Sequence, residues 1–190
     1  MKKLIFILAL TSLFLKPEKN HAQRNNKDWS VEIGLNIVDV RIYQASAGDI
    51  LKDYFGATEW PGNTGFPRIA IQKYLGNKLS LQLVGTINSL NTIVSLDDSN
   101  AKYLSIDAIL KRDLTKLFAS KSWFDPYLLL GLGSQTIASD SDIVVIGGLG
   151  FNILFDKRYG VNLQTSYKHG FGTGDRDVFQ HSISFVYKFS

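Results

Sequence analysis

Two histidines, His169 and His181, are the residues best suited to acid–base or nucleophilic chemistry after the N-terminal leader. A hydrolase that acts on lipids needs a histidine beside a nucleophilic serine, with a carboxylate to orient the imidazole ring. The nearby serines Ser166, Ser182 and Ser184 all stand an odd number of positions from both histidines. In an extended strand such residues point to opposite faces. The spacing argues against a catalytic triad, so we expect no enzyme, and a lipid hydrolase that uses either histidine is kept as an alternative.

Acidic residues occur in pairs within polar stretches, where they suggest either a protease site or a divalent-cation site. The pairs are Asp97 with Asp98, Asp140 with Asp142, and Asp175 with Asp177. Aspartates in such stretches usually form turns or stay solvated, and the spacing of a calcium-binding loop is absent. The sequence contains no cysteine, which excludes disulfides, thiolate catalysis and Cys-ligated metals. We therefore expect neither a metal nor a cofactor.

A third set of chemically capable residues consists of charged side chains that interrupt apolar segments at alternate positions. They are Glu32, Arg68, Asp107, Lys111, Lys168 and Lys188. If those segments are strands of a closed barrel, the charged side chains share its interior with the amides of Gln72, Gln82, Asn88, Asn152 and Gln164. We expect this polar network to plug the lumen, with Glu32 and Lys188 as an ion pair. The alternative is a conduction path whose selectivity these charges set.

Eight segments with a period of two are available to position these side chains. They cover residues 29–38, 66–75, 79–90, 103–112, 125–135, 143–155, 159–169 and 178–189. Apolar and polar residues that alternate over about ten positions are typical of a strand with two different faces. Over residues 103–112, for example, Leu104 and Ile106 alternate with Ser105 and Asp107. The fifth and sixth segments are too uniformly apolar for their faces to be assigned.

The connections between these segments alternate in length. Residues 76–78 and 156–158 suit tight turns, whereas residues 39–65, 91–102, 136–142 and 170–177 are longer and polar. Residues 113–124 are long for a short-turn position, and residues 49–55 suit a short helix. Bacterial transmembrane barrels have short periplasmic turns and longer extracellular loops. The pattern therefore predicts an all-β fold, an eight-stranded antiparallel up-and-down transmembrane β-barrel.

Aromatic residues indicate whether the apolar face points inward or outward. A soluble barrel of the lipocalin type alternates as well, but its apolar face lines an internal ligand cavity. Here aromatics gather at the predicted periplasmic ends of the segments, as they do at a lipid interface. We predict an aromatic girdle of Trp29, Trp123, Tyr127, Tyr159, Tyr187 and Phe189, to which Tyr74, Phe124 and Phe155 add. Phe66, Tyr103, Phe171 and Phe179 fall near the opposite ends. The apolar face is therefore expected to contact lipid.

The first 22 residues are predicted to be an export signal. Lys2 and Lys3 precede an apolar run over residues 4–15, which is shorter than the ~20 residues of a spanning helix. The leader ends near His21-Ala22-Gln23, and an uncleaved anchor or a buried helix is the alternative. It carries most of the net charge of +4, so the basic balance is poor evidence for nucleic-acid binding. We expect a signal peptide over residues 1–22 and one barrel domain over residues 23–190.

Several short motifs are spread over most of the chain after the leader. They are Lys27-Asp28-Trp29-Ser30, Gly65-Phe66-Pro67-Arg68, Trp123-Phe124-Asp125-Pro126-Tyr127, Tyr167-Lys168-His169 and Phe179-Gln180-His181-Ser182. Together they resemble the transmembrane half of outer-membrane-protein-A-like proteins, in particular the barrels common in the Bacteroidetes. Many such relatives continue into a peptidoglycan-binding domain. Because this sequence stops at Ser190, we expect either a stand-alone barrel or the barrel portion of a longer protein.

These inferences predict a structural or interaction role in the cell outer membrane. The barrel is expected to support envelope integrity and to present loops, above all residues 39–65, to protein partners. Outer-membrane lipid would surround it, and the insertion machinery would bind its C-terminal strand through Ile183, Phe185, Tyr187 and Phe189. A narrow porin-like channel for small solutes and a membrane-embedded lipid hydrolase are the alternatives, and no nucleic-acid partner is expected.

Overall fold

The computed structural model describes residues 29–40, 66–90, 101–115, 124–156, 158–172 and 176–189. The strands are β1 (Trp29–Asp39), β2 (Phe66–Gly76), β3 (Leu79–Leu90), β4 (Ala101–Asp113), β5 (Phe124–Ile137), β6 (Asp140–Leu154), β7 (Tyr159–Gly172) and β8 (Val178–Lys188). Each corresponds to one predicted segment. Within these ranges no helix is long and apolar enough to span a membrane.

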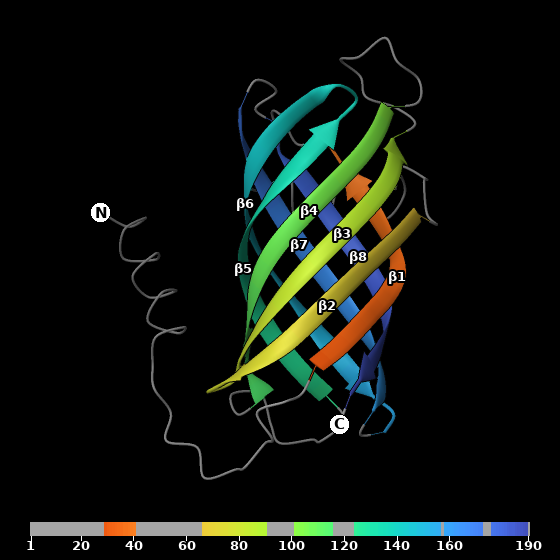
Figure 1. The fold of residues 1–190 in the computed structure, drawn as a ribbon, viewed down its shortest axis with the longest axis vertical. Helices are drawn as coiled ribbons and strands as arrows, with labels where there is room; N and C mark the ends of the chain where they lie inside the picture. Colours follow the sequence, from red (N-terminus) through yellow and green to blue (C-terminus); the bar gives the residue numbers. More distant parts are fainter. Residues whose placement is uncertain are drawn as a thin grey trace, which may run out of the picture.

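The strands form one closed antiparallel barrel (Figure 1). Each strand pairs with the next in sequence, and β8 returns to pair with β1, where Gly34 lies opposite Ser184. At this closure the Phe189 N–H donates a hydrogen bond of 2.7 Å to the Trp29 carbonyl. We call the end of the barrel that contains Trp29 and Phe189 the terminal end, and the opposite end, near Asp39 and Phe179, the loop end. The predicted all-β, eight-stranded antiparallel barrel is confirmed.

A tight turn joins β2 to β3 at the terminal end, as predicted. Asn77 and Lys78 both have positive φ, 49° and 62°, which is the backbone of a type I′ turn and matches the twist of the flanking strands. The Lys78 N–H donates to the Tyr74 hydroxyl at 3.2 Å. This contact ties the turn back to the strand that precedes it.

The connection between β5 and β6 is shorter than predicted. Instead of a loop over residues 136–142, the two strands pair as far as Ile137 and Asp140, and only residues 138–139 make the turn. The hydroxyls of Thr136 and Ser141 hydrogen-bond across the pair at 2.9 Å. Polar residues that suggested a loop therefore extend the ladder, and Ala138 reverses the chain with a φ of 57°. Residues 41–65, with the helix predicted over residues 49–55, and residues 91–100 lie outside the described part of the chain.

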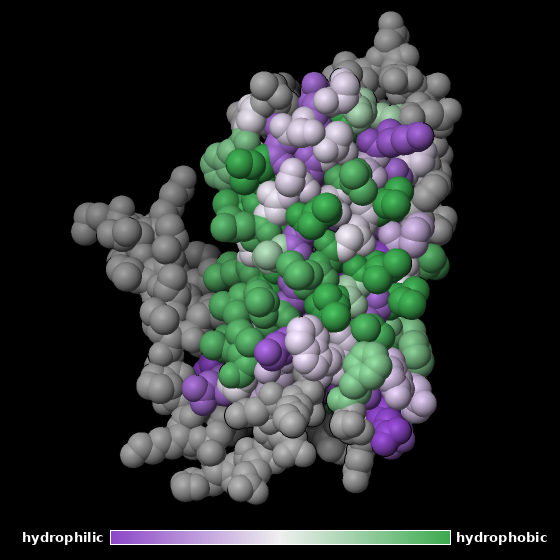
Figure 2. Space-filling view, viewed as in Figure 1, coloured by the Kyte–Doolittle hydropathy of each residue, from purple (hydrophilic) through white to green (hydrophobic). Residues whose placement is uncertain are grey.

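The outer face of the barrel is apolar and strongly exposed. On β4, Ile106 is 65% exposed, while its neighbour Asp107 is 1% exposed. The same holds for aliphatic side chains around the barrel, among them Ile33, Ile69, Leu83, Leu132, Ile143 and Ile183. Figure 2 shows this as an apolar belt across the middle of the visible face, with hydrophilic residues near both ends. Apolar outside and polar inside reverses the order of a soluble protein, and an apolar environment favours it.

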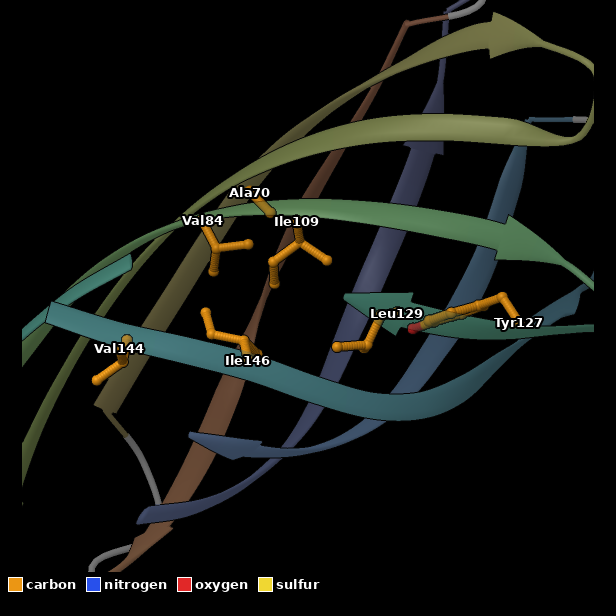
Figure 3. Packing of buried hydrophobic residues seen from close by; sticks show 7 residues of the cluster. All are labelled: Ala70, Val84, Ile109, Tyr127, Leu129, Val144 and Ile146. Atoms are coloured by element: carbon orange, nitrogen blue, oxygen red, sulfur yellow. The ribbon is translucent and has the colours of Figure 1, made fainter. Parts of the chain in front are cut away.

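Apolar side chains also fill part of the interior. A middle apolar cluster consists of Ala70, Val84, Ile109, Tyr127, Leu129, Val144 and Ile146, which point toward one another inside the barrel (Figure 3). A loop-end apolar cluster consists of Val38, Leu90, Ala101, Tyr103, Ile137 and Val178. These clusters settle the faces of β5 and β6 that the sequence left open. The interior thus combines apolar clusters with buried polar and charged side chains.

Candidate functional site

The lumen contains two separate ion-pair centres, and Glu32 on β1 is the middle of the first. Its carboxylate accepts from Arg68 Nη1 at 2.8 Å and from Lys111 Nζ at 3.3 Å. Arg68 on β2 also donates to Ser184 Oγ at 3.2 Å. The Glu32 and Arg68 side chains are 2% and 1% exposed. A buried charge is costly unless it is paired and hydrogen-bonded, and this centre satisfies one carboxylate with two cations.

The predicted Glu32–Lys188 ion pair is wrong. The β1–β8 register sets Lys188 opposite Ser30 and Glu32 opposite Val186. Lys188 lies at the mouth of the terminal end, 3.8 Å from Asp125 on β5. The Glu32 carboxylate pairs with Arg68 and Lys111 instead, because their long side chains reach it from β2 and β4.

The second centre joins β7 to β4 across the lumen. Lys168 Nζ donates to Asp107 Oδ2 at 2.6 Å, to Ser105 Oγ at 3.0 Å and to Tyr103 Oη at 3.0 Å. Both charged side chains are 1% exposed. Gly133 on β5 leaves the room for this centre, because a Cβ there would clash with Asp107 Oδ1. Tyr103, expected near the lipid interface, is fully buried in the lumen and belongs to this centre.

Tyr127 also faces inward, so its predicted place in the aromatic girdle is wrong. It is 4% exposed, and its hydroxyl accepts from Asn162 at 2.7 Å and donates to Gln164 at 3.1 Å. Its partner on β6 is Gly150, where a Cβ would clash with the tyrosine hydroxyl. An inward glycine directly across from an aromatic residue is the sequence signal that could have assigned this side chain to the lumen.

The predicted amides line the same lumen. Gln82 and Gln164 accept long hydrogen bonds of 3.4 Å from Arg68. Asn88 donates to Asn36 Oδ1 at 2.9 Å, and Asn152 accepts from Asn162 at 2.8 Å. Gln72 lines the cavity at the terminal end. Direct contacts between side chains therefore fill the polar part of the interior.

The two ends of the lumen differ. At the loop end, the loop-end apolar cluster closes the interior, and Arg176 binds over it: its carbonyl accepts from Gln135 at 2.9 Å, and its guanidinium donates to Asp140 at 2.9 Å. At the terminal end a cavity of about 80 Å³ penetrates as far as the first centre. Its lining includes Trp29, Tyr74, Lys111, Asp113, Asp125 and Lys188.

Outward aromatic residues gather at the terminal end. Trp29, Tyr159 and Phe189 are 42%, 43% and 46% exposed. The Tyr187 ring lies 5.4 Å from Tyr159 and 4.9 Å from Phe189. Trp123 lies outside the described residues.

The two histidines point outward, and the three serines considered with them are buried inside. Sequence reasoning missed their actual partners. His181 Nδ1 lies 2.5 Å from Thr165 Oγ1, and His169 Nδ1 lies 2.7 Å from Asp177 Oδ1. Thr165 is the β7 residue directly opposite His181 on β8, so the register between these strands was the missing information.

The acidic pairs do not assemble into one site. Asp142 is buried at 3% exposure, Asp140 binds Arg176, and Asp177 binds His169 on the outer face. Within the described residues no group of three or more His, Asp or Glu side chains is arranged to hold a metal. Asp97, Asp98 and Asp175 lie outside those residues.

No protein-family model and no curated protein matches the sequence. Solved structures do match. The attachment invasion locus protein Ail of Yersinia pestis is 16% identical, with a TM-score of 0.54 over 87% of this chain and 100% of that chain. Neisserial surface protein A is 15% identical, with a TM-score of 0.57 over 87% and 98%. OprG from Pseudomonas aeruginosa is 16% identical, with a TM-score of 0.55 over 86% and 96%. The fold is therefore that of the small eight-stranded outer-membrane barrels, with an interior plugged largely by polar side chains.

Proposed function

We propose that this protein is an outer-membrane barrel with a structural or surface-interaction role. The exposed aliphatic belt supports insertion, because such a surface is stable in hydrocarbon and unfavourable in water. The tight turn between β2 and β3 supports a periplasmic position for the terminal end, with the loop end outside. A signal peptide over residues 1–22 would direct export, and the mature barrel would begin near residue 23.

The observation that carries this proposal is the closed lumen. A solute would have to separate Arg68 from Glu32, then Lys168 from Asp107, and then pass the loop-end apolar cluster. Each separation exposes a buried charge, and breaking a buried pair costs about 3–5 kcal/mol. A barrel closed at three levels is better suited to support the envelope and present loops than to conduct.

Planar bilayer recordings on the purified protein test this role. We expect no reproducible unitary conductance from the native chain. Opening the first centre with Arg68→Ala should still give none, because the loop-end apolar cluster remains in place. Reproducible steps whose size changes with Arg68 or Lys168 substitutions would instead support the narrow channel, the alternative that the 80 Å³ cavity favours.

The proposed partners are outer-membrane lipid, the insertion machinery and surface proteins. The insertion machinery would bind the C-terminal strand β8 through the outward side chains of Ile183, Phe185 and Tyr187, together with Phe189. Extracellular loops, above all residues 39–65, would contact protein partners. The proposed family is that of the outer-membrane-protein-A-like barrels of the Bacteroidetes type. Fractionation of expressing cells checks the location: the protein should be recovered in the outer membrane and migrate differently on gels before and after heating. Recovery in the soluble fraction would reject the proposal.

A further inference from the structure

The outer face of β7 and β8 carries polar and ionisable side chains from the middle of the strands toward the loop end. We call this the histidine patch: Thr165, Tyr167, His169, Asp177 and His181. Thr165 contacts His181 across the strand pair, and Asp177 binds both neighbours on β7, with His169 at 2.7 Å and the Tyr167 hydroxyl at 2.5 Å. The patch thus consists of two hydrogen-bonded groups, and the Phe179 ring lies between them, 5.1 Å from the Tyr167 ring and 6.4 Å from the His181 ring.

Its height on the barrel can be estimated from the strand register. Tyr159 and Tyr187 face each other at the terminal end, Thr165 and His181 pair further up the same two strands, and His169 lies beyond them. At ~3.3 Å per residue and a tilt of about 40°, Thr165 and His181 lie about 15 Å above the tyrosines, and His169 about 25 Å above. The apolar band of such barrels is about 25 Å tall. The patch therefore extends from the outer interface into the apolar band.

An ionisable side chain within the apolar band, such as His181, is rare and is a functional-site hypothesis by default, because exposure to hydrocarbon is unfavourable. His169 lies at the outer edge of the same band. Charged side chains elsewhere in the barrel wall, such as Glu32, Asp107 and Lys168, are buried in the lumen. The His169 side chain is 49% exposed on the outer face. A ligand in the plane of the membrane would have direct access to it.

Beside the patch, the outer face of the barrel lacks a side chain at one position. Gly147 on β6 is the register partner of Tyr167, and a Cβ there would meet only Leu130 Cδ2, at 4.0 Å. Aromatic rings border the patch: Phe171 lies edge-on to His169 at 4.6 Å, and Phe179 stacks on His181 at 6.4 Å. The patch thus combines open space, ring faces and polar atoms within one area.

We propose that the histidine patch binds the sugar headgroup of a glycolipid in the outer leaflet. Imidazole and carboxylate groups hydrogen-bond to sugar hydroxyls, and ring faces pack on the apolar face of a sugar. The carboxylate of Asp177, with Asp39 one strand away opposite Phe179, makes the area unfavourable for a bare phosphate. This inference rests on the proposed membrane insertion and deepens it by naming a lipid class.

Histidine-selective ¹⁵N labelling gives a direct test. The sequence has three histidines, and the only two outside the leader both belong to the patch. The protein is placed in phosphatidylcholine vesicles with or without lipopolysaccharide, and the imidazole signals are compared. We expect the His169 and His181 signals to shift only with lipopolysaccharide, and lipopolysaccharide to be retained on the barrel in native mass spectrometry.

Two substitutions sharpen the test. Asp177→Asn should weaken retention about tenfold, the loss expected for one hydrogen bond to a charged group. Gly147→Val should block the site by filling its open space. Gly85→Val is the matched control, since Gly85 is also an outward glycine with nothing within 4 Å of its Cβ position, but lies on β3. It should retain lipopolysaccharide like the native chain.

Three results would overturn the proposal. The first is equal shifts in phosphatidylcholine alone, and the second is equal loss of retention in Gly85→Val and Gly147→Val. The third is a shift caused as strongly by a free glucosamine disaccharide without acyl chains, which would assign the site to a soluble sugar. Heat-dependent gel migration of the same samples reports insertion separately, so a failed barrel can be distinguished from a failed lipid site.

Discussion

The two ion-pair centres of the lumen use the same chemistry in different surroundings. Glu32 is shared by Arg68 and Lys111 and lies next to the terminal-end cavity. Asp107 has Lys168 as its cation and lies toward the loop-end apolar cluster, of which Tyr103 is a member. An unpaired charge is less costly where a second partner or water can reach it than in a dry interior. The Lys168 centre should therefore tolerate the loss of a partner less well than the Glu32 centre.

The largest effect is expected from Lys168→Met. It leaves the 1%-exposed Asp107 carboxylate without its cation, and breaking a buried pair costs about 3–5 kcal/mol. Urea unfolding in lipid vesicles, followed by the gel migration of unheated samples, should show this loss. The double variant Lys168→Met/Asp107→Asn carries no unpaired charge and should recover most of it. Equal losses in the single and double variants would show that the ion pair is not the cause.

Glu32→Gln should have a smaller effect, although it removes the carboxylate that two cations share. The side chain keeps its size and can still accept a hydrogen bond from Arg68, and the adjacent cavity can hydrate Lys111. The expected loss is about 2 kcal/mol, in the range for hydrogen bonds to charged groups. The same urea titration measures it. A loss greater than that of Lys168→Met would show that the Glu32 centre tolerates the loss of a partner less well than the Lys168 centre.

Tyr127→Phe removes a hydroxyl that bonds to Asn162 and Gln164 beside the first centre. The expected loss is about 1 kcal/mol, typical of a neutral hydrogen bond. Tyr159→Phe is the matched control, because Tyr159 is 43% exposed on the outer face. If both variants lost the same stability, the hydrogen bonds of the buried Tyr127 hydroxyl would contribute nothing to the stability of the barrel.

Lys188→Met should have the smallest effect. Lys188 lies 3.8 Å from Asp125, and both side chains are about one-fifth exposed. Solvent screens such a pair, which contributes about 0–1 kcal/mol. A loss comparable with that of Glu32→Gln would mean that Lys188 contributes to the first centre after all.

Much of the fold follows from the sequence because alternation has a period of two and a membrane barrel must separate its two faces. For the same reason the positions of Glu32, Arg68, Asp107 and Lys168 in the lumen could be predicted. Alternation gives no information where both faces are apolar, as in Leu128 to Leu130, so the apolar clusters were missed.

Partners across the lumen could not be predicted. They depend on the stagger of the strands and on side-chain length, so Arg68 and Lys111 rather than Lys188 reach Glu32. Tyr103 and Tyr127 were misplaced for different reasons. Tyr103 shares the face of Ser105 and Asp107, so alternation already placed it in the lumen, but its position near a strand end was read as a lipid interface. Tyr127 lies in a uniformly apolar segment, and only its register opposite Gly150 shows that it faces the lumen.

The ladder between β1 and β8 has a consequence for the order of biosynthesis. It joins the first strand of the described chain to the last, so the sheet keeps two open edges until Lys188 is available to pair with Ser30. Open edges attract other strands, and contacts between distant residues form slowly. Closure can therefore occur only after all eight strands, from Trp29 to Lys188, have been synthesised, and until then the unfinished sheet exposes edges that can pair with other chains.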